Sequence, residues 1–183
     1  MKQLLFFTLS VVLIGCGEPQ PRRPIEVKTG SVLKKSVERN KELLALEEQQ
    51  MLNIIQKDSL NKYFHSGGGS WYHYVKRNEE ADYHPQTDDL VTLQYNIMTF
   101  NNDTIYSKED IGILTYKVDK QNLFPGLRNS VKLLKENETA TFLFPSSLAY
   151  GYHGDDDKIG INVPIKSTIT LLKIDKQQEN NQN

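Results

Sequence analysis

Two short segments of the sequence set an apolar helix entry beside a loop that carries a tyrosine. The first runs from Leu123 to Val131 and begins Leu-Phe-Pro-Gly-Leu, and the second runs from Phe144 to Gly151 and ends Leu-Ala-Tyr-Gly. The chemistry that such residues offer is apolar contact and one neutral hydrogen bond from a tyrosine hydroxyl. The plainer alternative is that their aromatic residues, with those of the neighbouring strands, are ordinary core side chains.

An acidic run, His153 with Asp155, Asp156 and Asp157, is the group that comes nearest to a metal site. Loops rich in oxygen ligands bind calcium, but this spacing lacks the glycine turn and the distal glutamate of a known calcium loop. A solvated loop is therefore favoured. The remaining histidines share no common spacing, and we expect neither a metal nor a cofactor.

Residues 1–15 predict a signal peptide. Lys2 is followed by an apolar run that is too short to span a bilayer as a mature helix. The run ends Leu-Ile-Gly-Cys, which resembles a bacterial lipobox, and Cys16 is where lipidation would occur. A plain signal sequence with an accidental cysteine is the less favoured alternative, because this cysteine is the only one in the chain. A single cysteine also excludes an internal disulfide.

Lipidation at Cys16 would attach the protein to a membrane without spanning it. We therefore expect a lipoprotein of the bacterial cell envelope that faces the periplasm. Gly17 stands where some bacteria place an aspartate that retains lipoproteins in the inner membrane, so the outer membrane is favoured over the inner one.

The charge composition limits the kinds of partner that the chain is expected to bind. The chain of 183 residues has 22 basic and 23 acidic residues and a formal net charge of −1, and it shows no basic stripe. Nucleic acid is therefore not an expected partner. The length suits one globular domain with additional N-terminal residues.

Apolar periodicity divides the rest of the chain. Residues 16–30 carry three prolines and predict a flexible tether after the lipidated cysteine. Residues 31–66 form an N-terminal segment that is predicted to be helical from 31 to about 64. Packing of this helix on its own domain is favoured over a dimer through residues 31–64. Residues 67–175 follow as a sheet domain, and residues 176–183 are predicted to be a disordered polar tail.

Within 67–175 the sequence predicts an α+β fold, a twisted antiparallel sheet wrapped on one short helix. Three consecutive glycines at 67–69 end the N-terminal helix and are most simply a hinge. The expected helix covers residues 127–134. The expected strands cover residues 71–75, 90–98, 113–118, 138–144 and 165–172.

From 89 to 174 the order and spacing of these features resemble the FKBP-type peptidyl-prolyl cis-trans isomerases. The Cys anchor, the N-terminal helix and the Trp-Tyr-Xaa-Tyr strand are similar to those of the gliding-motility-associated isomerase lipoproteins of that family. The resemblance implies a hydrophobic pocket for a proline-containing segment of an exported protein. It assigns catalytic roles to Tyr150, Tyr106 and Phe124. It assigns substrate contacts to Tyr95, Leu114, Leu123, Leu127, Ile159 and Ser167.

Prolyl isomerisation forms no covalent bond to the enzyme, so a neutral pocket suffices without a nucleophile, a base or a metal. The resemblance also shows departures. Ser107 stands where many members carry an acid, and aliphatic residues replace aromatic ones at positions 114 and 127. We expect a weak isomerase that assists folding of envelope proteins, with a role in gliding motility. The alternatives are a non-catalytic peptide-binding chaperone or assembly factor, and a spacer whose N-terminal helix docks a membrane complex.

Overall fold

The computed structural model describes residues 29–177. The signal peptide, Cys16 and most of the predicted tether and tail lie outside this range. The chain divides into two compact units, Met1–Ser36 and Val37–Asn183, and the sheet lies within the second. None of the helices between residues 29 and 177 is both long and apolar enough to cross a membrane.

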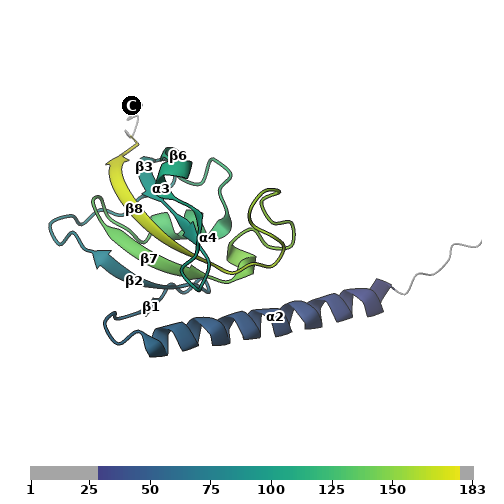
Figure 1. Ribbon diagram of the computed structural model, residues 1–183. Coiled ribbons are helices and arrows are strands. Elements are labelled where there is room, and N and C mark those ends of the chain that lie inside the picture. The colour runs from purple at the N-terminus through teal and green to yellow at the C-terminus, as the bar shows by residue number, and fades with distance from the viewer. Residues whose placement is uncertain (1–28, 178–183) are drawn as a thin grey trace, which may run out of the picture. The chain divides into compact units, whose positions relative to one another are not determined.

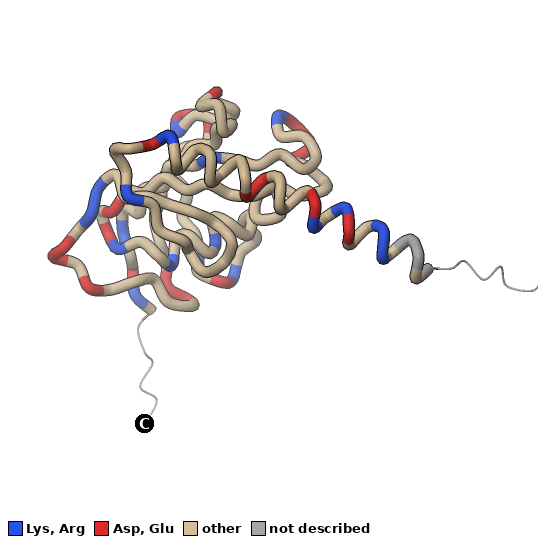
Figure 2. Tube along the Cα trace, turned by 90° about the horizontal axis from the view of Figure 1, so that it is seen from below, with Lys and Arg blue, Asp and Glu red and all other residues tan. Residues whose placement is uncertain are grey.

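Helix α2, Thr29–Lys57, is the long N-terminal helix. The helix carries both acidic and basic residues (Figure 2). Within the second unit, Glu47 and Met51 are its two buried positions. These residues are four apart, so they lie on one face of the helix. Val37 and Leu44, which precede Met51 at seven-residue spacing, remain 51% and 38% exposed. The helix therefore packs on its own domain through a narrow contact.

The helix ends earlier than the predicted boundary near residue 64. Asp58 stops it, because its backbone N–H still bonds to Ile54 while its side chain accepts hydrogen bonds from the backbone N–H groups of Leu60 and Asn61. Such local side-chain bonding competes with helix continuation. Phe64, predicted to be helical, instead begins the first strand.

The second unit contains one sheet in which all pairs of strands are antiparallel. Its strand order is β1-β2-β7-β8-β3-β6, and the β4–β5 hairpin is attached through β8. The strands are β1 Phe64–His65, β2 Trp71–Lys76, β3 Leu90–Tyr95, β4 Ile97–Met98, β5 Thr104–Tyr106, β6 Ile113–Lys117, β7 Thr139–Phe144 and β8 Ile165–Asp175. The predicted fold class is confirmed.

Strand β1 forms one edge of the sheet and is only two residues long. Its Phe64 pairs with Tyr72 and its His65 with Trp71, while β2 continues to Lys76. The imidazole ring of His65 packs edge-on against the Trp71 ring at 4.9 Å between centroids. The outer edge of β2 beyond Tyr72 is thus left without a paired strand among the described residues.

The strand predicted over 90–98 is two strands, separated at Asn96. The Asn96 carboxamide oxygen accepts the backbone N–H of Thr168 at 2.8 Å, and its backbone carbonyl accepts the Ser167 hydroxyl at 2.6 Å. These bonds fasten the chain to β8 and release Ile97 and Met98 into the hairpin with β5.

The sheet curves past helix α4, Pro125–Val131 (Figure 1), which is the predicted short helix shifted by two or three residues. Pro125 occupies its first turn, where a missing N–H costs nothing. Gly126 is required, since a Cβ there would lie 2.6 Å from the Phe144 ring and 2.8 Å from the Leu148 carbonyl oxygen. The start of α4 therefore lies directly against β7 and the short 3-10 helix η2, Ser146–Leu148.

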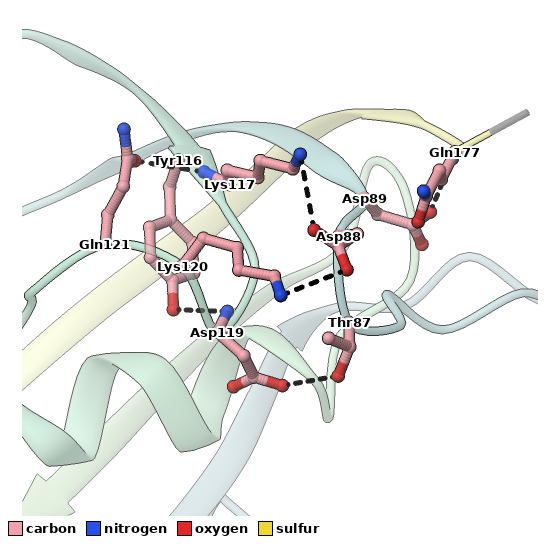
Figure 3. A network of polar contacts seen from close by, with 9 residues as sticks. All are labelled: Thr87, Asp88, Asp89, Tyr116, Lys117, Asp119, Lys120, Gln121 and Gln177. Carbon is pink, nitrogen blue, oxygen red and sulfur yellow. Dashed lines mark hydrogen bonds and ion pairs between the residues drawn. The ribbon is translucent and has the colours of Figure 1, made fainter.

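A polar network fixes the far end of the sheet (Figure 3). Asp88, just before β3, forms salt bridges with Lys117 at 3.2 Å and with Lys120 at 3.3 Å. The two lysines come from the end of β6 and the turn after it. The neighbouring Asp89 accepts the backbone N–H of Gln177 at 2.8 Å. The network ties β3, β6 and β8 together at the end where the chain enters β3.

Candidate functional site

Phe124 is the centre of an aromatic cluster. It is the N-cap residue of α4, and its ring lies 5.3 Å from Tyr150, 5.8 Å from Phe144 and 6.2 Å from Tyr95, measured between centroids. Phe124 and Tyr95 are 9% and 8% exposed, so each keeps a small surface open. Rings at these distances and tilts have favourable aromatic geometry. The structure thus brings together Tyr95, Phe124 and Tyr150, three predicted site residues from separate segments of the chain.

The turn after η2 presents Tyr150. Gly151 adopts φ of +59°, and its N–H bonds to the Ser146 carbonyl at 2.9 Å, which closes the turn around the tyrosine. Burial, followed by the electrostatic effects of the neighbouring Tyr95 and Asp155, raises the pKa of Tyr150. Among the residues that the structure describes, none accepts or donates a hydrogen bond to its hydroxyl. The site therefore offers a neutral donor beside the Phe124 ring.

Tyr106, at the end of β5, is held by an acidic loop. Its hydroxyl donates to Asp155 Oδ2 at 2.6 Å, and Asp157 Oδ2 lies 3.1 Å away. The hydrogen bond that Tyr106 donates to Asp155 raises the pKa of Tyr106 to about 12. The Lys158 ammonium lies 4.7 Å above the centroid of the same ring. The loop that the sequence predicted to be a solvated flap is therefore fastened to a site residue.

Asp155 also organises the loop itself. Its Oδ1 accepts the backbone N–H of Ile159 at 2.7 Å and that of Asp157 at 3.0 Å. Desolvation opposes ionisation of this carboxyl, but the hydrogen bonds from Tyr106 and from the backbone outweigh it and lower the pKa of Asp155. Ile159 is only 3% exposed. The carboxylate thus joins Tyr106 to the loop segment that buries Ile159.

Ser107, at the position where an acid was expected, has a different role. It is the N-cap of helix α3, Lys108–Ile111, and exchanges two hydrogen bonds with Asp110 in a capping box. A carboxylate reaches Tyr106 from Asp155, 49 residues along the chain. Sequence reasoning missed this contact, and its one signal was the acidic composition of the loop.

The other predicted contact residues lie at different depths. Leu114 and Leu123 are partly buried against the core, whereas Leu127 and Ser167 are fully buried. The Ser167 hydroxyl is already bonded to the Asn96 carbonyl. In this conformation Leu127 and Ser167 have no surface that a ligand could touch, so their predicted part in binding would be support from behind.

Residues 81–172, about half of the chain, match the model of the FKBP-type peptidyl-prolyl cis-trans isomerase family. The chain belongs to this family. A sequence relative, the probable FKBP-type peptidyl-prolyl cis-trans isomerase FkpA of Neisseria meningitidis serogroup B, is 35% identical over 111 residues. That match covers 60% of this chain and 39% of the relative, so the chain spans about two fifths of the relative's length.

Solved structures show the same fold at low sequence identity. FkpA from Escherichia coli has a TM-score of 0.58 and 17% identity, and the match covers 96% of this chain and 82% of that one. A peptidyl-prolyl cis-trans isomerase from Pseudomonas syringae pv. tomato has a TM-score of 0.58 and 14% identity, with 74% and 96% covered. The predicted family and fold are thus confirmed.

Proposed function

We propose that this chain catalyses cis-trans isomerisation of Xaa-Pro bonds through the pocket formed by Phe124, Tyr95 and Tyr150. The observation that carries the proposal is the unengaged Tyr150 hydroxyl beside the Phe124 ring, 5.3 Å away between centroids. The barrier to rotation is about 18–20 kcal/mol and is set by amide resonance. A pocket lowers it by binding the twisted amide more tightly than the planar one.

The reaction needs no proton transfer, so the neutral side chains of the pocket would suffice for it. The rings of Phe124 and Tyr95 would exclude water from the peptide carbonyl, which weakens the solvation that favours the planar, resonance-stabilised amide. The Tyr150 hydroxyl would donate to a substrate carbonyl and orient it. A single neutral hydrogen bond contributes only about 0.5–1.5 kcal/mol, so the shape of the pocket carries most of the effect.

Tyr106 and Asp155 would form the acidic wall of the pocket. Their 2.6 Å hydrogen bond places a carboxylate close to the aromatic residues although Ser107 caps a helix. We propose that Asp155 supplies the negative charge at this wall and that its loop sets substrate preference. Leu114, Leu123 and Ile159 complete the apolar contacts, with Leu127 and Ser167 behind them.

The setting that we propose is the bacterial envelope. The lipobox and the short apolar run before Cys16 support a lipid anchor, with the domain facing the periplasm and the outer membrane favoured over the inner one. Clients would be exported proteins with proline-containing segments. The N-terminal helix and the Trp-Tyr-Xaa-Tyr strand support a role in gliding motility.

The test of catalysis is an exchange NMR assay of the chain with Xaa-Pro peptides that carry leucine or phenylalanine before proline. We expect faster cis-trans exchange than in buffer. No acceleration at enzyme concentrations that saturate the peptide would overturn the proposal.

Two further measurements test the setting. Mass spectrometry of the membrane fraction should show acyl chains on Cys16, and Cys16→Ser should release the protein from that fraction. Loss of the gene should stop spreading of a gliding host, with restoration by the wild-type gene. Normal spreading of the deletion strain would remove the gliding role while leaving the isomerase proposal intact.

A second candidate function is a non-catalytic peptide-binding chaperone. The observation that favours it is Ser107, whose capping box with Asp110 leaves no acid at that position. A chaperone of this kind would suppress aggregation of an unfolded client, keep doing so after Tyr150→Phe and Phe124→Ala, and leave the exchange rate of bound peptides unchanged.

A further inference from the structure

A concave surface lies at the open edge of the sheet, away from the aromatic cluster around Phe124. It is a groove of about 390 Å³ between the segment before β1 and the end of β2, and Phe64 and Tyr74 form its aromatic wall. Leu60 and Val75 line it with 92% and 60% of their surface exposed. None of the predicted site residues lines it. Its position therefore makes it a separate surface rather than an extension of the pocket.

Beyond Tyr72, the edge of β2 that borders this groove has no paired strand among the described residues. Strand β1 covers only Trp71 and Tyr72, so β2 runs on toward Lys76 without an outer partner among the described strands. Val75 is also the bulged residue of the pairing with β7, since Tyr74 pairs with Ala140 and Lys76 with Thr139. An open edge of this kind accepts an extended peptide as an added strand.

Two cations lie over the aromatic wall. Arg77 Cζ is 4.1 Å from the Tyr74 ring centroid and 5.3 Å from that of Phe64, and Lys62 Nζ is 5.4 Å from the Phe64 centroid. Within residues 29–177 neither cation forms a salt bridge, and the groove lining contains no acidic residue. The surface therefore combines apolar contact with two cations that form no ion pair among the described residues.

Glu138 is the acid whose charge acts on Tyr74, and its carboxylate already accepts hydrogen bonds from the backbone. Glu138 accepts the backbone N–H of Asn78 at 3.1 Å and that of Lys135 at 2.9 Å, and it is 3% exposed. Glu138 is thus a buried structural acid, and within residues 29–177 it forms no ion pair with Lys62 or Arg77. A carboxylate that pairs directly with these two cations would come from a ligand.

We propose that this groove binds an extended polypeptide segment that carries an acidic residue next to an aromatic or aliphatic one. The segment would add to the edge of β2 through main-chain hydrogen bonds, place its carboxylate between Lys62 and Arg77, and pack its apolar side chain against Phe64. The site needs no proline and gives the chain a second hold on unfolded protein. It rests on the proposed client class but not on catalysis.

The experiment uses the full chain in a mild detergent and a fluorescein-labelled, proline-free peptide, acetyl-Thr-Val-Glu-Phe-Asp-Val-Thr-amide. We expect saturable binding by fluorescence anisotropy and a loss of at least about tenfold in affinity for the double variant Lys62→Glu with Arg77→Glu. A peptide with lysine in place of both acids should bind the double variant better than the wild type. Such reciprocal rescue would show direct charge pairing.

Lys176→Glu is the matched control, because Lys176 also lies over an aromatic ring, that of Tyr83 at 4.0 Å, outside the groove. It should leave peptide affinity unchanged, and an equal loss would overturn the proposal in favour of general charge attraction. N-methylation of alternate peptide residues should abolish binding, and full affinity of the methylated peptide would exclude strand addition.

Two outcomes separate this site from its alternatives. Tyr150→Phe should lower isomerisation and leave anisotropy binding unchanged, so failure of catalysis and failure of the groove are distinguishable. If the wild-type chain dimerises in sedimentation and the double variant is a monomer that still binds the peptide, a second copy is the occupant and the proposal fails.

Discussion

The Glu47 carboxylate accepts the backbone N–H of Ser146 at 2.9 Å, although the two residues are 99 positions apart. Glu47 is 3% exposed and Ser146 is 2% exposed. Ser146 begins η2, whose turn closes on Gly151 and presents Tyr150. One charge on the N-terminal helix is therefore bonded directly to the backbone that positions the proposed catalytic tyrosine.

We predict that Glu47→Ala destabilises the domain by about 1–3 kcal/mol, because it leaves the buried Ser146 N–H without an acceptor. The isomerase rate should fall as well, since the Tyr150 turn loses its anchor. Denaturant unfolding and the exchange assay measure the two effects. Glu48→Ala, on an exposed position of the same helix, is the control. Glu47→Gln keeps an acceptor and should recover most of the stability, and its failure to do so would contradict this account.

Tyr150→Phe should lower the rate of Xaa-Pro exchange by about 2- to 10-fold, the range that corresponds to one neutral hydrogen bond of about 0.5–1.5 kcal/mol. Because its pKa lies above the ordinary 10.0, the wild-type tyrosine should stay protonated, and its contribution should stay constant, from pH 7 to 10. Tyr152→Phe, at a position that is 66% exposed, should be unchanged. Equal rates for the two variants would remove Tyr150 from the mechanism.

Asp155→Asn should change the acid stability of the chain. Because the folded-state pKa of Asp155 lies below the ordinary 3.8, the ionised carboxylate stabilises the folded protein above pH 3.8. That stabilisation disappears as the pH falls from 3.8 through the lowered pKa. The wild type should thus unfold at a higher temperature than the variant at pH 6, and the gap should close in strong acid. Asp156→Asn, which is exposed, should show no such gap.

Gly126→Ala should destabilise the domain by about 1–3 kcal/mol through overpacking. The added methyl group would lie 2.8 Å from the Leu148 backbone oxygen, which cannot move as freely as a side-chain end. Gly160→Ala is the matched control, because its nearest neighbour, Val163 Cγ2, lies at an ordinary 3.9 Å. Urea unfolding compares the two, and a similar midpoint for both would show that α4 can shift without cost.

Much of the fold could be predicted because the strands of a half-buried sheet have alternating apolar and polar residues. Strand β8 alternates buried and partly buried residues from Ile165 to Leu171. The interruption at Asn96 was not visible, since Tyr95 and Ile97 are both buried and the alternation continues through it. What breaks the strand is hydrogen bonding to residues more than 70 positions away.

The candidate site divides in the same way. Phe124 and Tyr150 lie in short segments whose order and spacing could be compared with a family, and the structure places their rings 5.3 Å apart. Asp155 was read as a solvated loop residue, because its partner Tyr106 is 49 residues distant and a lone carboxylate carries no periodic signal. The contact of Glu47 could not be predicted for the same reason, because its partner Ser146 is 99 positions away. Asp58 is different, since its local turn with Leu60 and Asn61 was within reach of sequence rules.

The contact between His65 and Trp71 has a practical consequence. Trp71 is the only tryptophan of the chain, and it belongs to the strand pair that ends at the basic and aromatic groove. The pocket around Phe124 contains tyrosine and phenylalanine, with leucine at position 127. Intrinsic tryptophan emission is therefore an optical reporter for the sheet edge alone. In a titration of the unlabelled chain, the tryptophan emission should change with an extended acidic peptide and should stay constant with a proline ligand.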